Sequence, residues 1–422
     1  MEEVISTLCA NTLTLLIAVN IIRPVFARDK AKIWSPITTI SLVYIYYCLM
    51  PYYGGQMEDY AIDEATNKGY LFHIAALLSY ICILIGFSKS SSTNFRRWNT
   101  LFDEDNAGKY GMALFLVGLA CYVPFRGLHF SFAQNETHEW MQGGPVYYFI
   151  TMIDLFSIAA ALLLVRLKKN WKQIYYLLPF WIMLVTFIFA GTRWRIVVYT
   201  ITLLTTYYLF PRPKKVNVLF VGALAVVLFL GFSIMDQTRN YSQGIDMEAA
   251  SQLEFDDIKG GAHENYSVYW FSMLSMRQLH DTGERVYFQP ALTALLMPLP
   301  RAVFPWKPDA KYLDRMEQII IGSDEGGAAF LNFVESYMSF GWFGVIFMGW
   351  LLGWLARKFW DNYRNNPQSV GAVIALGAFS GVCYCIISRG FLASTLTNVI
   401  YVVYLPFWLC SLFKRFLTKK KA

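Results

Sequence analysis

Six basic residues stand at the ends of apolar stretches, where their side chains could bind a phosphate group. Five of them are arginines, and the set is Arg126, Arg193, Arg195, Arg301, Lys307 and Arg389. A guanidinium group can donate two parallel hydrogen bonds to phosphate oxygens, so several arginines together suit a pyrophosphate. The spacing does not show that the six meet. Each could instead pair with a carboxylate or with the phosphate of a lipid.

Three residues could accept a proton during a reaction. Glu335 enters an apolar stretch among aromatic residues, where partial desolvation would make its carboxylate a better general base. His263 and Glu264 are adjacent at the start of a segment with helically spaced aromatic residues. A structural ion pair between Glu335 and an arginine is the alternative interpretation.

Other acidic residues have a simpler interpretation. Asp154 lies inside an apolar stretch. It could be a buried partner of Arg126 or make a polar contact between helices, and a proton-relay acid is the alternative. The pair Glu58 and Asp59 could hold a divalent metal, although a solvated loop is the better interpretation. The Asp103–Asp105 run resembles a nucleotide-sugar site, but its segment is too short for a soluble transferase domain. We therefore expect no metal and no cofactor, and the absence of a glycine-rich phosphate loop argues against ATP-driven chemistry.

The elements that must position these residues are membrane helices. Of the 422 residues, 56% are hydrophobic and 15% are charged, against roughly 25% charged in a soluble domain. The net charge of +7 is not gathered into one patch, which argues against a nucleic-acid partner. The composition predicts an all-α integral membrane protein.

Stretches long enough to cross the bilayer follow from a window of about 19 residues. Eleven spans are expected, near 4–22, 36–53, 70–88, 109–126, 146–166, 174–191, 194–210, 216–235, 330–356, 369–388 and 392–413. Threading them with the N-terminus outside leaves 23 Lys and Arg residues inside and 13 outside, 8 of them in one long loop. The positive-inside rule therefore predicts an outer N-terminus and a cytoplasmic C-terminus.

Three parts of the chain follow from this threading. Residues 1–235 hold eight helices, residues 236–329 form the large outer loop, and residues 330–422 hold three helices and a basic tail. Within the loop, Glu264–Leu279 has helical spacing, and Val286–Leu299 fits a short apolar helix. A packed extracellular cap without chemistry is the alternative for this loop.

Four short motifs have the order and placement typical of a known family. They are Ala190-Gly191-Thr192-Arg193, then Leu299-Pro300-Arg301 with Trp306-Lys307-Pro308, then Glu335-Ser336-Tyr337 with Gly341-Trp342-Phe343-Gly344, and finally Arg389-Gly390. With these motifs and its topology, the chain resembles the bacterial Wzy-type polymerases of O-antigen or oligosaccharide repeat units.

The resemblance implies a reaction and a place for it. A GT-C-like bundle would transfer a growing glycan from undecaprenyl pyrophosphate to the non-reducing end of a lipid-linked repeat unit. The reaction would occur at the outer face of the bacterial plasma membrane, with a chain-length regulator protein as a partner. The six cations would bind pyrophosphate, and Glu335, then His263 and Glu264, would be the candidate bases. An O-antigen ligase-like transferase, or a flippase or transporter of lipid-linked oligosaccharide, is the alternative.

Overall fold

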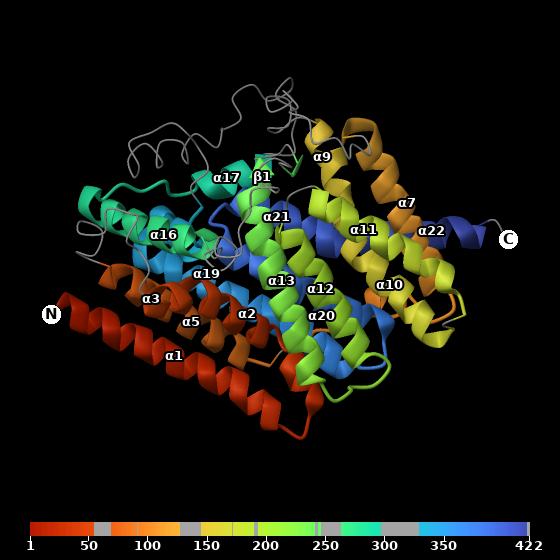
Figure 1. Ribbon diagram of the computed structural model, residues 1–422, viewed down its shortest axis with the longest axis horizontal. Coiled ribbons are helices and arrows are strands. Elements are labelled where there is room, and N and C mark those ends of the chain that lie inside the picture. The colour runs from red at the N-terminus through yellow and green to blue at the C-terminus, as the bar shows by residue number, and fades with distance from the viewer. Residues whose placement is uncertain are drawn as a thin grey trace. The chain divides into compact units, whose positions relative to one another are not determined.

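The computed structural model is built almost wholly of helices (Figure 1). It describes residues 1–54, 69–90, 92–126, 145–170, 172–189, 193–240, 244–245, 263–296 and 329–419. Within those ranges, the β-structure consists of β1 (Arg239–Asn240) paired antiparallel with β2 (Gly244–Ile245). The all-helical expectation is confirmed for the part of the chain described.

Two compact units divide the chain, and each combines segments from distant parts of the sequence. The first contains residues 1–91, 264–358 and 383–397, and the second contains residues 92–263, 359–382 and 398–422. Each of the last two expected spans is thus divided between the two units, and the loop helices belong to the first unit. The three-part division by membrane topology stays a prediction.

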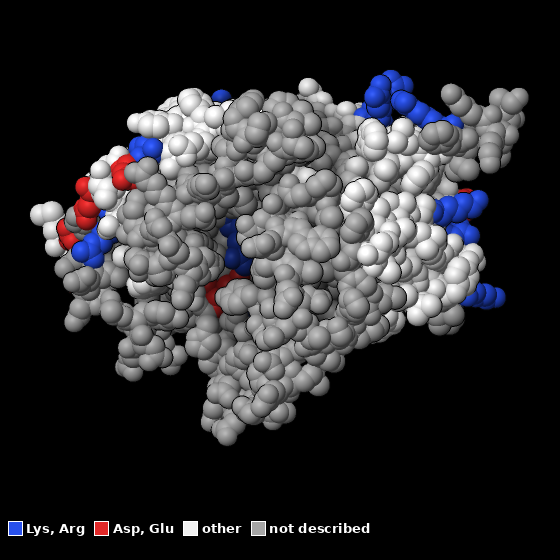
Figure 2. Space-filling view, turned by 90° about the horizontal axis from the view of Figure 1, so that it is seen from above, with Lys and Arg blue, Asp and Glu red and all other residues white. Residues whose placement is uncertain are grey.

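Seven helices in the described ranges are long and apolar enough to cross a membrane. They cover Glu2–Phe26, Tyr70–Ser88, Ala107–Pro124, Tyr148–Lys169, Asn332–Asn365, Val370–Ser388 and Leu392–Arg415. Each coincides with an expected span, and together they make the chain a multi-pass membrane protein. Where the surface is described, Figure 2 shows broad areas without charge and Lys and Arg mainly at their margins.

The other four expected spans are also helical but are not among these seven helices. Residues 36–54 form α2 (Pro36–Tyr44), a π-helical segment (Ile45–Leu49) and α3 (Met50–Gly54). The remaining three are α11 (Leu177–Phe189), α12 (Arg193–Leu209) and α13 (Val218–Thr238). The count of eleven crossings and the GT-C-like arrangement stay predictions.

In the first unit, α5 (Tyr70–Ser88) lies against α1 (Glu2–Phe26) and, through close backbone approach, against α19 (Asn332–Asn365). A side chain at Gly349 or Gly353 would collide with the backbone of α5, so the Gly349-x₃-Gly353 spacing permits this approach. The loop helices exist as predicted, as α16 (His263–Thr282) and α17 (Gln289–Leu296). The hydroxyl of Tyr269 on α16 lies 3.0 Å from Nε2 of the buried His73 on α5.

Helix α19 is not the continuous span expected near 330–356. Its helical geometry breaks at Phe340 and at Gly341, where φ is +60°. That angle favours glycine, because a side chain would be strained there. The short piece before the break, which carries Glu335, is also held by the N–H of Val286, which donates to the carbonyl of Met338 at 3.0 Å.

The second unit is built around α7 (Ala107–Arg126), α10 (Phe156–Lys169) and α12. Residues Gly377 and Gly381 on α20 (Val370–Ser388) lie against Thr202 and Val198 of α12, which fits the second small-residue spacing in the sequence. It also contains α11 and α13, together with α6 (Arg96–Asn99), α9 (Pro145–Thr151) and α22 (Leu405–Lys419). Helix α21 (Leu392–Val399) begins in the first unit and leads into α22.

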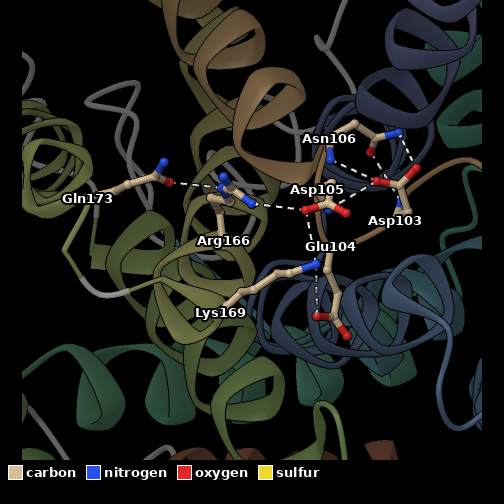
Figure 3. A network of polar contacts seen from close by, with 7 residues as sticks. All are labelled: Asp103, Glu104, Asp105, Asn106, Arg166, Lys169 and Gln173. Atoms are coloured by element: carbon tan, nitrogen blue, oxygen red, sulfur yellow. Dashed lines mark hydrogen bonds and ion pairs between the residues drawn. The ribbon is translucent and has the colours of Figure 1, made fainter.

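The acidic run before α7 is an exposed turn engaged by basic side chains (Figure 3). Oδ1 of Asp103 accepts hydrogen bonds from the N–H groups of Asp105 and Asn106. The carboxylate of Asp105 lies 2.9 Å from Lys169 and 3.2 Å from Arg166, and its hydrogen bond with Lys169 lowers the pKa of Asp105. These contacts support the interpretation of the run as a solvated acidic turn.

Candidate functional site

One cavity in the first unit is bordered by two of the candidate residues, Glu335 and Arg389. It has a volume of about 390 Å³ and lies among α17, α19 and the start of α21. Polar groups from Asn332, Ser339 and Thr395 also border it. The rest of its wall is apolar and includes exposed aromatic side chains: Tyr287, Phe288, Phe340 and Phe343. The cavity thus combines a carboxylate, a guanidinium group and an apolar mouth.

The carboxylate of Glu335 is held at the beginning of α21. Both oxygens accept the N–H of Leu392, at 2.9 and 3.2 Å, and the residue is only 6% exposed. The first N–H groups of a helix lack partners within the helix and carry partial positive charge, so they favour an anion. Glu335 therefore caps α21 and faces the cavity at the same time.

The guanidinium of Arg389 is oriented by a carboxylate from a distant part of the sequence. Its Nη2 lies 2.7 Å from Oε1 of Glu264, and the side chains are 39% and 11% exposed. Burial disfavours the charged guanidinium, but the carboxylate of Glu264 favours it, and the pKa of Arg389 is raised in this site beside the hydroxyls of Tyr47 and Tyr384. Those hydroxyls lie 2.7 Å apart. Arg389 remains a fixed cation with part of its surface open.

The turn that carries Arg389 requires glycine at the next position. The N–H of Gly390 donates to the carbonyl of Phe330 at 2.6 Å. A methyl group at position 390 would lie 2.4 Å from the ring of Phe330. The chain therefore passes from α20 to α21 through a turn packed directly against the segment before α19.

Replacing Gly390 by alanine is expected to lower stability and to reduce glycan elongation. Overpacking of this kind costs about 1–3 kcal/mol, and relief of the clash would displace both Arg389 and the Leu392 N–H. Thermal unfolding in detergent and gel analysis of the surface glycan would measure the two effects. Gly222→Ala is the control, because a methyl group there meets nothing within 4 Å. Equal behaviour of the two variants would contradict the packing argument.

Two further candidates, Arg193 and Arg195, lie in the second unit on the first turn of α12. Arg193 is buried, and Nε of Arg195 lies 2.6 Å from Oδ1 of Asp154, whose side chain is fully buried. The expected ion pair of Asp154 is therefore made with Arg195, while the side chain of Arg126 lies outside the described residues. Two cations at a helix N-terminus oppose the helix dipole, an arrangement that an additional anion would stabilise.

Replacing Asp154 by alanine is expected to cost up to about 3–5 kcal/mol, because it leaves the partly buried guanidinium of Arg195 without its carboxylate. Thermal unfolding of Asp154→Ala, Arg195→Ala and the double variant would measure the coupling between them. The double variant should be more stable than the sum of the single losses indicates. Strict additivity would show that the pair contributes no interaction energy.

Several candidate residues lie beyond what the structure describes. The segments with Arg301 and Lys307, and with Glu58 and Asp59, are outside the described ranges. His263 begins α16, but its side chain is not described. These assignments stay predictions.

One arginine near the cavity was not predicted from the sequence. The guanidinium of Arg285 stacks 4.7 Å from the ring centre of Tyr337 and donates to the carbonyls of Leu279 and Glu284. It also lies close to Gly341, at the break in α19. The sequence offered one signal for Arg285: it lies between the two predicted loop helices, where a cation is expected to bind groups on the neighbouring segments.

A comparison with protein families decides the class of the chain. The family model for the O-antigen polysaccharide polymerase Wzy matches residues 33–421. The chain belongs to this family. The match includes Glu335, Arg389, Arg193 and Arg195 within one continuous region, so this Wzy-family polymerase carries its candidate sites inside the part that defines the family. No curated protein and no solved structure matches the chain.

Proposed function

We propose that this Wzy-family chain joins lipid-linked oligosaccharide units in one group-transfer step. A hydroxyl oxygen at the non-reducing end of the acceptor attacks the anomeric carbon of the donor glycan. The bond from that carbon to undecaprenyl pyrophosphate breaks, and its electron pair leaves with the pyrophosphate oxygen. The hydroxyl proton passes to a carboxylate, and the new glycosidic bond joins the two glycans.

The observation that carries this proposal is the presence of a carboxylate and a guanidinium group in the wall of one cavity. Glu335 and Arg389 border the same space of about 390 Å³. That volume is within the usual range for small-molecule sites, of which a few polar groups in an apolar wall are typical. A lipid-linked pyrophosphate has matching parts: an anion for Arg389 and apolar isoprene units for the exposed aromatic mouth.

Each residue then has a chemical role. Arg389 stabilises the negative charge that develops on the leaving pyrophosphate. Glu264, already paired with Arg389, is a positioning residue rather than a base, because its charge is committed to that pair. Glu335 accepts the proton, with His263 as the second choice for the base. Arg193 and Arg195, with Arg126, Arg301 and Lys307, are assigned to further pyrophosphate contacts.

The reaction is assigned to the outer face of the bacterial plasma membrane. The charge distribution that predicts an outer N-terminus puts Arg389, Arg193 and the segment from 236 to 329 on that side. The glycosyl–pyrophosphate bond supplies the driving force, so no nucleotide is required there. A chain-length regulator protein is the expected partner.

Deletion of the gene followed by gel analysis of the surface glycan tests this function. Loss of a polymerase leaves single repeat units attached to the final acceptor. Long chains retained on the lipid carrier would instead identify a ligase, and absence of both products would identify a flippase or transporter. Re-expression of the intact chain should restore the normal length distribution.

A further inference from the structure

Two lysines of the second unit converge on one aromatic ring. The ammonium groups of Lys168 and Lys214 lie 5.1 and 4.6 Å from the ring centre of Tyr207. Lys168 is half-buried at the end of α10. It donates to the carbonyl of Tyr207, in the last turn of α12, and to that of Phe210, just beyond this helix. Lys214 is exposed on the connection from α12 to α13. Two like charges therefore meet over a single ring.

The nearby carboxylates are engaged elsewhere. Asp105 and Glu104 pair with Arg166 and Lys169, as Figure 3 shows. Within the described ranges, neither Lys168 nor Lys214 has an ion pair with a carboxylate. The two lysines repel each other, and a phosphate group between them would relieve that repulsion.

The same aromatic ring begins a long apolar groove. Tyr207 lines a space of about 1000 Å³ between α11, α12 and α13, whose other wall residues include Leu203, Leu224, Leu228 and Phe232. On α13 the groove extends from Phe220 to Ile234, or about 21 Å at 1.5 Å per residue. One leaflet contributes about 15 Å of hydrocarbon, so the groove can hold an acyl chain over its full depth.

From this geometry we infer that the groove of α11–α13 binds an anionic phospholipid, with its phosphate between Lys168 and Lys214. Basic pockets beside membrane helices are a general means of binding acidic lipid headgroups. The two lysines at one end of the groove match the phosphate of the lipid, and the apolar wall matches its acyl chain. The inference is independent of the reaction proposed above, because it concerns the second unit and needs no turnover.

Lipid binding to the purified full-length protein tests the inference. Native mass spectrometry would compare phosphatidylglycerol with three probes: phosphatidylcholine of the same acyl chains, the glycerophosphoglycerol headgroup alone, and undecaprenyl phosphate. Phosphatidylglycerol should bind at least about fivefold more tightly than phosphatidylcholine, as expected for one lysine contact. The headgroup without chains should not bind.

Matched variants distinguish binding of the lipid at this site from general attraction of an anionic lipid to a basic surface. Lys214→Ala should weaken phosphatidylglycerol binding about fivefold, whereas Lys215→Ala, at the adjacent exposed lysine, should change it less than twofold. Gly231→Phe should fill the groove, because Gly231 lines it and has open space at its Cβ. Gly222→Phe is the control on the same helix, since Gly222 is equally open but lies outside the groove.

Three results would overturn the inference. Equal losses from Lys214→Ala and Lys215→Ala would show a general basic surface. Unchanged binding in Gly231→Phe would show that no chain occupies the groove. Binding of undecaprenyl phosphate without binding of phosphatidylglycerol would identify a different occupant. None of these outcomes bears on the glycan pattern of the deletion strain.

Discussion

Replacing Arg389 by alanine is expected to abolish glycan elongation while the protein remains in the membrane. Removing one fixed group that stabilises developing negative charge costs on the order of 10²–10³-fold in rate, or roughly 3–4 kcal/mol. Gel analysis of the surface glycan would show single repeat units in place of long chains. Arg389→Lys should recover only part of the activity, because an ammonium group lacks the bidentate fork.

The matched control for this prediction is Arg277→Ala. Arg277 lies on α16, 13 residues beyond Glu264, or about 20 Å along the helix. It should leave the glycan length unchanged. This comparison separates the specific charge at position 389 from any general effect of removing an arginine in the first unit.

A charge swap distinguishes a structural from a catalytic role of Arg389. The variant Arg389→Glu/Glu264→Arg preserves an ion pair at the same place, so it should recover much of the stability lost in either single change. It should not recover elongation, because a carboxylate would then stand where the pyrophosphate needs a cation. Normal glycan length in the double variant would show that Arg389 has only a structural role, as the partner of Glu264.

Helices were predictable from the sequence because their signals are local. Apolar runs of membrane length lie at Tyr70–Ser88 and Val370–Ser388, within one residue of the predicted bounds. The close approach at Gly349 and Gly353 followed from their four-residue spacing, which puts both on one helix face. These features depend on neighbours a few positions away.

The break in α19 could not be predicted in the same way. A glycine within an apolar run is ordinary in membrane helices, and its positive φ at position 341 depends on packing against Arg285 and the loop before α17. The partner of Asp154 was missed for a similar reason. Arg195 is 41 residues away, and only the packing of α12 against α10 brings the two together.

The shared cavity of Glu335 and Arg389 is also a tertiary property. The residues are 54 positions apart, and the sequence indicated each one separately as a candidate. The hydrogen bonds from Leu392 to Glu335 and from Gly390 to Phe330 join the two segments. A carboxylate at a helix N-terminus has an immediate structural explanation, so its catalytic role requires a variant that preserves the cap.

Replacing Glu335 by glutamine is such a variant. The amide oxygen can still accept the N–H of Leu392, so the free energy of unfolding should change by less than about 1 kcal/mol. Glutamine cannot accept the hydroxyl proton, and loss of a general base costs on the order of 10²–10⁴-fold. Elongation should therefore stop although the protein remains stable. Gel analysis of the surface glycan measures the first effect, and thermal unfolding measures the second.

Glu335→Ala and Asp281→Asn complete the comparison. Alanine removes the cap as well as the base, so it should lose both stability and elongation, whereas the exposed Asp281 on α16 should tolerate the change to an amide. If Glu335→Gln gives normal chain lengths while Glu335→Ala is unstable, then Glu335 only caps α21. If Gln and Ala both stop elongation but only Ala destabilises, the capping and proton-accepting roles are separate. The stable Gln variant then isolates the proton transfer.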